Sequence, residues 1–164
     1  MKPFIRPYLM LLSGCFFFLS SFSLPKETTS LPQQKTYTLT VVITGMRNNT
    51  GRLQLDLYKN QTEYSARMSS EERRAYVYKK NAKKGTSKSY SITHTYKSVP
   101  GGIYGIALFD DENSNGEIDY GWFLPKEGFG FGDYYHTKWS TPHFNDFKFT
   151  LNSNKTVTMI VRYL

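Results

Sequence analysis

The sequence predicts an all-β protein, an antiparallel β-sandwich of about seven strands. Short runs of alternating apolar and polar residues recur along the chain, with turn residues between them. Aromatic residues make up 16% of the sequence, a content that suits two packed sheets. The chain has 164 residues, enough for one domain with a substantial core. A β-α-β rhythm is missing, which argues against a nucleotide-binding fold.

The first residues are typical of a secretory signal peptide, which we assign to residues 1–23. Lys2 and Arg6 supply positive charge, residues 8–19 are apolar, and residues 20–23 offer small side chains for cleavage. This apolar run is too short for a transmembrane helix, and we expect no membrane span in the mature chain. The sequence therefore predicts an exported protein, periplasmic or secreted.

The single cysteine leaves a second processing route open. Cys15 ends the run Leu-Ser-Gly-Cys, which matches a lipobox, so a lipoprotein anchored through Cys15 is the alternative. Residues 16–19 are apolar, whereas lipoproteins usually continue with polar residues, and this favours cleavage near Ser23. On the favoured route the mature domain has no cysteine, and on either route it has no disulfide and depends on its core for stability.

The predicted elements begin after a spacer. Residues 24–35 contain two prolines and show no apolar periodicity, so we predict a disordered spacer there and one folded domain over 36–164. Residues 37–43 and 53–57 alternate as strands do. The turn residues at 46–51 between them predict a first hairpin.

The middle and the end of the chain supply the remaining elements. Residues 62–74 predict a short helical turn, and residues 75–78 predict a short edge strand. Residues 89–99 alternate again. Residues 103–109 are continuously apolar, which predicts a central strand covered on both faces. The last two predicted strands are 144–151 and 156–163.

Charge is divided between two segments of a chain whose net charge is +8. Residues 110–133 hold seven acids and one base, and residues 71–88 hold seven bases and two acids. We interpret the basic segment as a solvated loop whose lysines protect an edge strand. Its alternative role is docking on anionic lipid or polysaccharide. Export argues against a nucleic-acid partner.

The acidic segment contains the most specific motif. From Asp111 the chain reads D-x-N-x-N-G-x-I-D, a spacing that lets one loop wrap a calcium ion. Trp122 stands where such loops carry a bidentate Glu, and Asp110 or Glu127 could replace it. The alternative is a hairpin of Asx-turns without an ion. The predicted calcium ligands are the side chains of Asp111, Asn113, Asn115 and Asp119 and the backbone carbonyl of Glu117.

Further motifs favour binding over catalysis. The rings in and around the glycine-rich run 125–133 predict either a satellite core, which we favour, or an exposed platform for sugars or peptides. The three histidines, His94, His136 and His143, lack metal-ligand spacing, and no G-x-S-x-G motif occurs. We therefore expect a non-enzymatic binding or accessory module. The alternative is a glycan-acting hydrolase that uses acids of the 110–133 loops.

The calcium-type motif and the block Pro-Lys-Glu-Gly-Phe-Gly-Phe at 125–131 together resemble the bacterial exported family named domain of unknown function 2141. The resemblance runs from about Tyr37 to Leu164. It has three departures: Asp110 stands where the family usually has His, the stretch between Asp119 and Pro125 is one residue short, and Gly132 replaces a usual Ser. It implies an exported β-sandwich of immunoglobulin-like or prealbumin-like kind, and it implies no activity. The partners we expect are cell-envelope polysaccharide or protein.

Overall fold

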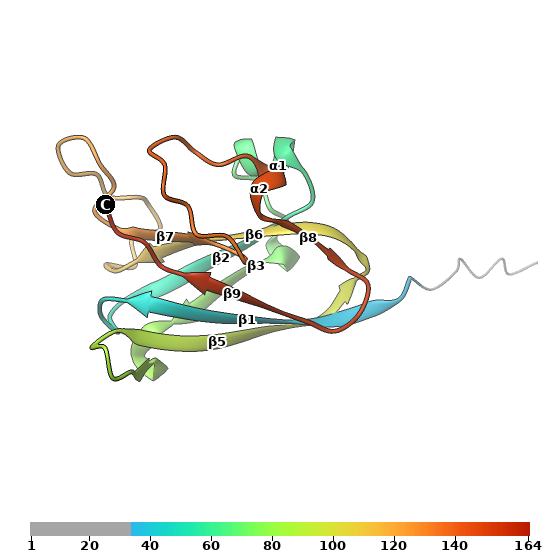
Figure 1. Cartoon of the computed structure of the whole chain (residues 1–164), viewed down its shortest axis with the longest axis horizontal. Coiled ribbons are helices and arrows are strands. Elements are labelled where there is room, and N and C mark those ends of the chain that lie inside the picture. Colours follow the sequence, from blue (N-terminus) through green and yellow to red (C-terminus); the bar gives the residue numbers. More distant parts are fainter. Residues whose placement is uncertain (1–33) are drawn as a thin grey trace, which may run out of the picture. The chain divides into compact units, whose positions relative to one another are not determined.

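The computed structural model describes residues 34–164, and these form a sandwich of two sheets (Figure 1). The predictions of a signal peptide, of Cys15 as an anchor and of most of the spacer lie outside the described residues. The predicted fold class is confirmed, with nine strands among residues 34–164 instead of about seven. The first sheet runs in the order β4 (Lys83–Lys84), β5 (Tyr90–Pro100), β1 (Thr36–Met46) and β9 (Lys155–Ile160).

The second sheet has β6 at its centre. One edge of β6 pairs with β2, and its other edge pairs with β7 and β8, one after the other along its length. β3 pairs with the free side of β2 and is an edge strand, as predicted. The strands are β3 (Arg74–Tyr78), β2 (Arg52–Tyr58), β6 (Gly102–Asp111), β7 (Gly128–Phe131) and β8 (Lys148–Leu151).

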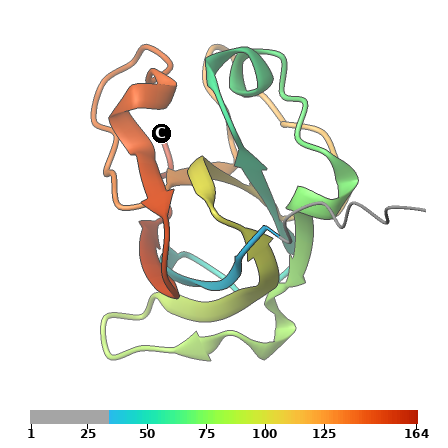
Figure 2. The same cartoon turned by 90° about the vertical axis from the view of Figure 1, so that its right-hand side faces the viewer.

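Short helical turns lie on the outer side of the second sheet and at its edge. Figures 1 and 2 show α1 and α2 on the face that points away from β1 and β5. No helix among residues 34–164 is long and apolar enough to cross a membrane. The turns are α1 (Gln61–Ser65), η1 (Glu71–Arg73), η2 (Lys79–Asn81) and α2 (Phe144–Phe147).

The core forms because side chains alternate along each strand. Leu39, Val41 and Ile43 of β1 face the second sheet, and every other residue of β2 faces back toward them. Burying one such aliphatic side chain contributes roughly 1.5–3 kcal/mol. The fully buried aliphatic residues are Leu39, Val41, Ile43, Leu53, Leu55, Leu57, Ile106, Leu151 and Val157.

The predicted first hairpin is wrong. β1 and β2 belong to different sheets, since β1 pairs with β5 and β9 while β2 pairs with β3 and β6. The turn between them therefore carries the chain across the sandwich. Alternation shows which residues of a strand are buried, and it does not show which strand lies beside it, so the sequence left this pairing undetermined.

Two other elements differ from their prediction. Residues 144–151 do not form one strand, because the first four form α2, with a capping box between His143 and Asp146. Phe144 and Phe147 are both buried, since positions three apart share one face of a helical turn. Within the predicted loop 125–133, Gly128–Phe131 is a strand that pairs with β6.

Aromatic residues form a second cluster on the outer face of the second sheet. Tyr64 of α1 meets the rings of Tyr58 and Phe147 edge-on at 5.4 and 5.0 Å. Phe131 and Phe144 complete the buried part of this cluster. Of the rings predicted to form a satellite core, Phe131 is buried in this cluster, and Phe129 and Tyr134 pack against it. The four other rings of that prediction are exposed instead: Trp122 (96%), Phe123 (87%), Tyr135 (52%) and Trp139 (76%).

Candidate functional site

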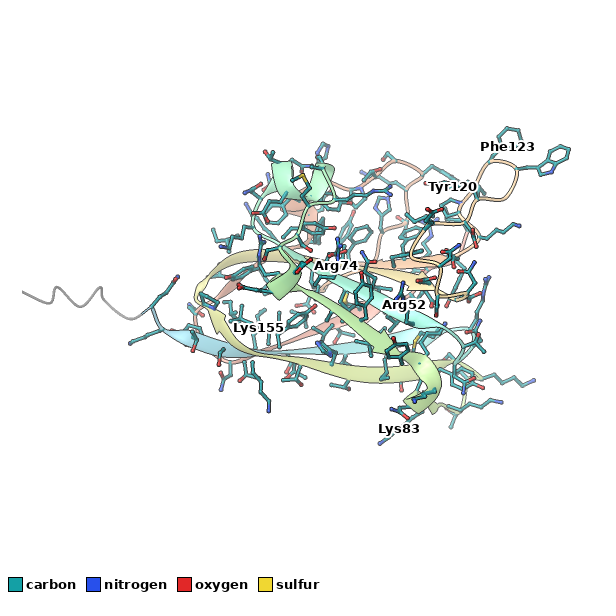
Figure 3. The ribbon with its side chains drawn as sticks, turned by 180° about the vertical axis from the view of Figure 1, so that it is seen from behind. Arg52, Arg74, Lys83, Tyr120, Phe123 and Lys155 are labelled. Carbon is teal, nitrogen blue, oxygen red and sulfur yellow. The ribbon has the colours of Figure 1, made fainter. Side chains whose placement is uncertain are left out.

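The acidic loop connects β6 to β7 and spans residues 112–127. β6 ends with Asp110 and Asp111, and both are fully buried although their side chains leave the strand in opposite directions. Asp110 contacts Lys79, and Asp111 contacts Arg52. Figure 3 shows Phe123 at the outer tip of the loop, with Arg52 nearer the sheet.

Asp111 binds to the loop that it opens. Its Oδ2 accepts hydrogen bonds from Arg52 Nε at 2.8 Å and from the backbone N–H of Gly116 at 3.0 Å. Its Oδ1 has no hydrogen-bond partner, and no other buried side-chain nitrogen or oxygen in the described part of the chain lacks one. A buried carboxylate oxygen is costly without a donor or a cation, so this atom is a candidate contact for either.

The other three predicted side chains converge within the loop. Asn113 Oδ1 accepts the N–H of Asn115 at 3.0 Å, and Asn115 Oδ1 accepts the N–H of Glu117 at 2.8 Å. The carboxylate of Asp119 accepts from Asn113 Nδ2 at 2.6 Å and from Asn115 Nδ2 at 3.4 Å. The side chain of Glu117 is exposed. Asx-turns of this kind order the loop, and they occur with or without an ion.

Glu127 closes the loop from the β7 side. Its two carboxylate oxygens accept the backbone N–H groups of Glu112 and Asp119 at 3.0 and 3.1 Å. Burial raises the pKa of Glu127, while these two N–H donors oppose that rise. Glu127 therefore folds back onto the loop, as expected. Both of its carboxylate oxygens accept hydrogen bonds from backbone N–H groups.

The oxygen-bearing side chains of the loop are of the kind that a hard cation such as calcium prefers, but few of them are carboxylates. Among the described residues no group of three or more His, Cys, Asp or Glu side chains could hold a metal. An ion here would depend on Asp111 Oδ1 and Asp119, with amide and backbone oxygens from the rest of the loop. Asp110 is wrong as a replacement for the missing Glu, because its carboxylate binds Lys79 and Tyr163.

A groove of about 960 Å³ lies beside the acidic loop, over the outer face of the second sheet. The loop forms one wall, and the segment 136–143 forms another. Its floor includes the aromatic rings of Phe129 and Phe131 from β7. His136 also lines the groove. Its ring nitrogen Nε2 forms a hydrogen bond with the backbone oxygen of Ser140, at a distance of 2.5 Å. The exposed aromatic residues that line it are Tyr120, Phe123 and Trp139.

The basic segment is not uniformly solvated, which corrects our interpretation of residues 71–88. Lys79 is fully buried, and its Nζ lies 2.6 Å from Asp110 Oδ1. The O–H of Tyr163 donates to Asp110 Oδ2 at 2.5 Å. The sequence did carry one signal for this: Asp110 occupies an inward position after Ile106 and Leu108, where a carboxylate needs a partner. Lys80, Lys83, Lys84 and Lys88 are exposed, as predicted.

These observations define a class: a β-sandwich with a calcium-type loop between two strands of one sheet and an aromatic groove beside it. The chain belongs to the family described as uncharacterized protein conserved in bacteria (DUF2141), whose model matches residues 41–159. The predicted resemblance is thereby confirmed. Searches of the curated proteins and of the solved structures found no match.

Proposed function

We propose that this protein is an exported, non-enzymatic binding module whose acidic loop binds calcium and forms one wall of the ligand groove. The observation that carries the proposal is Asp111 Oδ1, which is buried and unpaired in a loop with calcium-site spacing. The other oxygen of the same carboxylate already holds Gly116 N–H, so the carboxylate faces the loop. A bound cation would satisfy the unpaired oxygen.

Each residue of the loop has a distinct part in this proposal. Arg52 orients the carboxylate of Asp111, and Gly116 makes the bend with a φ of +81° that glycine tolerates. Asn113 and Asn115 bring their amides to Asp119. Calcium, when bound, supplies a divalent charge that holds these oxygens together. With few charged ligands the site suits the millimolar calcium found outside cells.

The state of the other acids supports binding more than hydrolysis. A glycosidase needs two carboxylates that face a bond from opposite sides. Glu112 is held by Arg47 in a two-pronged ion pair at 2.7 and 2.8 Å, and Glu127 is held by backbone N–H groups. The groove instead offers exposed rings such as Trp139, which stack on sugars or on peptide side chains. Cell-envelope polysaccharide or protein is the partner that we propose.

Millimolar calcium is expected to raise the melting temperature relative to chelator, because only the folded loop binds the ion. Stabilisation at about ten times Kd is roughly 1.4 kcal/mol, which corresponds to a shift of about 5 °C for a domain of this size. Differential scanning calorimetry measures it.

Two variants make the calcium experiment specific. Asp119→Asn is expected to lose the calcium shift, since it removes one of two carboxylates, and Asp111→Ala is expected to do the same. Glu72→Gln removes one exposed charge far along the chain from the loop and is expected to keep the full shift. Equal melting temperatures of the wild type with calcium and with chelator would contradict the proposal.

Export itself has a separate test. Because residues 1–23 have the order of charges and apolar residues of a signal peptide, the mature chain is expected to begin near Leu24, without lipid. N-terminal sequencing and intact mass of the exported protein measure this. A mature chain that begins at Cys15 and carries a diacylglyceryl group would establish the lipoprotein route instead.

A further inference from the structure

A buried lysine and a buried aspartate meet at the base of the acidic loop, outside the proposed calcium site. Lys79 and Asp110 are both fully buried, and Nζ lies 2.6 Å from Oδ1. Lys79 directly follows the edge strand β3, whereas Asp110 belongs to the central strand β6. β2 runs between these strands, so the pair spans three strands of the sheet.

The surroundings of this pair isolate it from water. Two opposite charges removed from water lose their hydration, and the only hydrogen bond of Lys79 Nζ among the described residues is to Asp110. A reaction within the pair would begin with transfer of one proton from the ammonium to the carboxylate, which leaves an amine beside a carboxylic acid.

We propose that Lys79 and Asp110 condense to form an isopeptide bond between Nζ and Cγ. The amine lone pair attacks Cγ, the N–C bond forms, and the bond between Cγ and Oδ1 breaks. Oδ1 leaves as water with two protons, the one transferred from the ammonium and one released by the nitrogen during the attack. The amide nitrogen keeps the third proton. The reaction is redox-neutral and uses no co-reactant.

Tyr163 supplies the stabilisation that such an attack requires. Its O–H donates to Asp110 Oδ2, the oxygen that carries negative charge in the tetrahedral intermediate. The donor is therefore positioned before the reaction and need not reorganise. Exclusion of solvent from Lys79 and Asp110 also favours condensation, since the reverse reaction consumes water.

Such a bond would give this domain a covalent cross-link of a kind that its cysteine content does not allow. Cys15 is the only cysteine, so the domain over residues 36–164 cannot form a disulfide. An amide between Lys79 and Asp110 would fasten an edge strand covalently to the centre of its sheet. This inference does not depend on calcium binding, and either proposal can fail without the other.

Intact mass spectrometry of the purified protein under denaturing conditions tests the inference. With the N-terminus fixed by sequencing, the wild type is expected to be lighter than its sequence by one water. Tryptic digestion is expected to yield a branched peptide in which Lys79 is uncleaved and joined to Asp110. Lys79→Arg is expected to have the full sequence mass, because a guanidinium group is not nucleophilic.

Two outcomes would overturn the inference. One is a wild type of full sequence mass whose tryptic peptides around Lys79 and Asp110 are separate. The other is a loss of water that persists in Lys79→Arg, since that would place the dehydration elsewhere, as in a succinimide. The branched peptide is sought in the wild type itself, so the test holds even if the variant does not fold.

Discussion

Replacing Lys79 by alanine is expected to lower the free energy of unfolding by about 3–5 kcal/mol, because it leaves the carboxyl group of Asp110 buried without the partner that Lys79 supplies, whether as an ion pair or as an amide. Lys80→Ala is the matched control, since its side chain is exposed and surface substitutions usually stay within about 0.5 kcal/mol. Urea denaturation of both variants measures the difference. Similar small effects for the two lysines would restore the interpretation of this segment as wholly solvated.

A double replacement separates the buried charge from the buried volume. Lys79→Met with Asp110→Leu puts apolar side chains at both positions, and such exchanges of buried ion pairs are often neutral or stabilising. We therefore expect the double variant to recover most of the stability that Lys79→Ala loses. An unfolded double variant would show that the chain needs the polar contact itself, including the hydrogen bond from Tyr163.

Gly51→Ala is expected to cost about 3 kcal/mol or more, because a side chain there meets backbone that cannot move aside. A Cβ at Gly51 would lie 2.2 Å from the carbonyl oxygen of Asp111 and 2.5 Å from that of Glu112. The φ of Gly51 is also +74°, in the left-handed region.

Gly85→Ala is the control for that experiment. Its new Cβ would come no closer than 3.4 Å to Ser89 O, and its φ is not positive. Thermal melts of the two variants compare them directly. If Gly51→Ala melted together with Gly85→Ala, the crossing between the sheets would be more adaptable than the structure indicates.

The sequence predicted the strands better than it predicted their neighbours. Alternation over residues 53–57 identified β2 and its buried face, because burial of every second residue is a local property. The partners of β2 are set by contacts between distant segments, as between Leu55 and Leu108. Local periodicity carries no information about which distant strands pair. The incorrect prediction of the first hairpin follows from this.

In the candidate site too, local contacts could be predicted from the sequence and long-range contacts could not. Asn113, Asn115 and Asp119 contact one another, and such contacts are foreseeable from their spacing because a short loop brings its own residues together. Lys79 was misassigned because it stands among exposed lysines and its partner is 31 residues away. The groove also could not be predicted from the sequence, because the segment 136–143 forms its second wall only after folding.

The pairing of β1 with β9 has a consequence for how the chain folds. β9 lies parallel to β1, with Leu39 opposite Lys155 and Thr44 opposite Ile160, so the first and last strands are neighbours. Contacts this distant along the chain require a large loop to close, and proteins dominated by them fold in milliseconds to seconds. For a chain that emerges N-terminus first, β1 must wait for the last strand. Until then one edge of β1 stays unpaired and open to association with other chains.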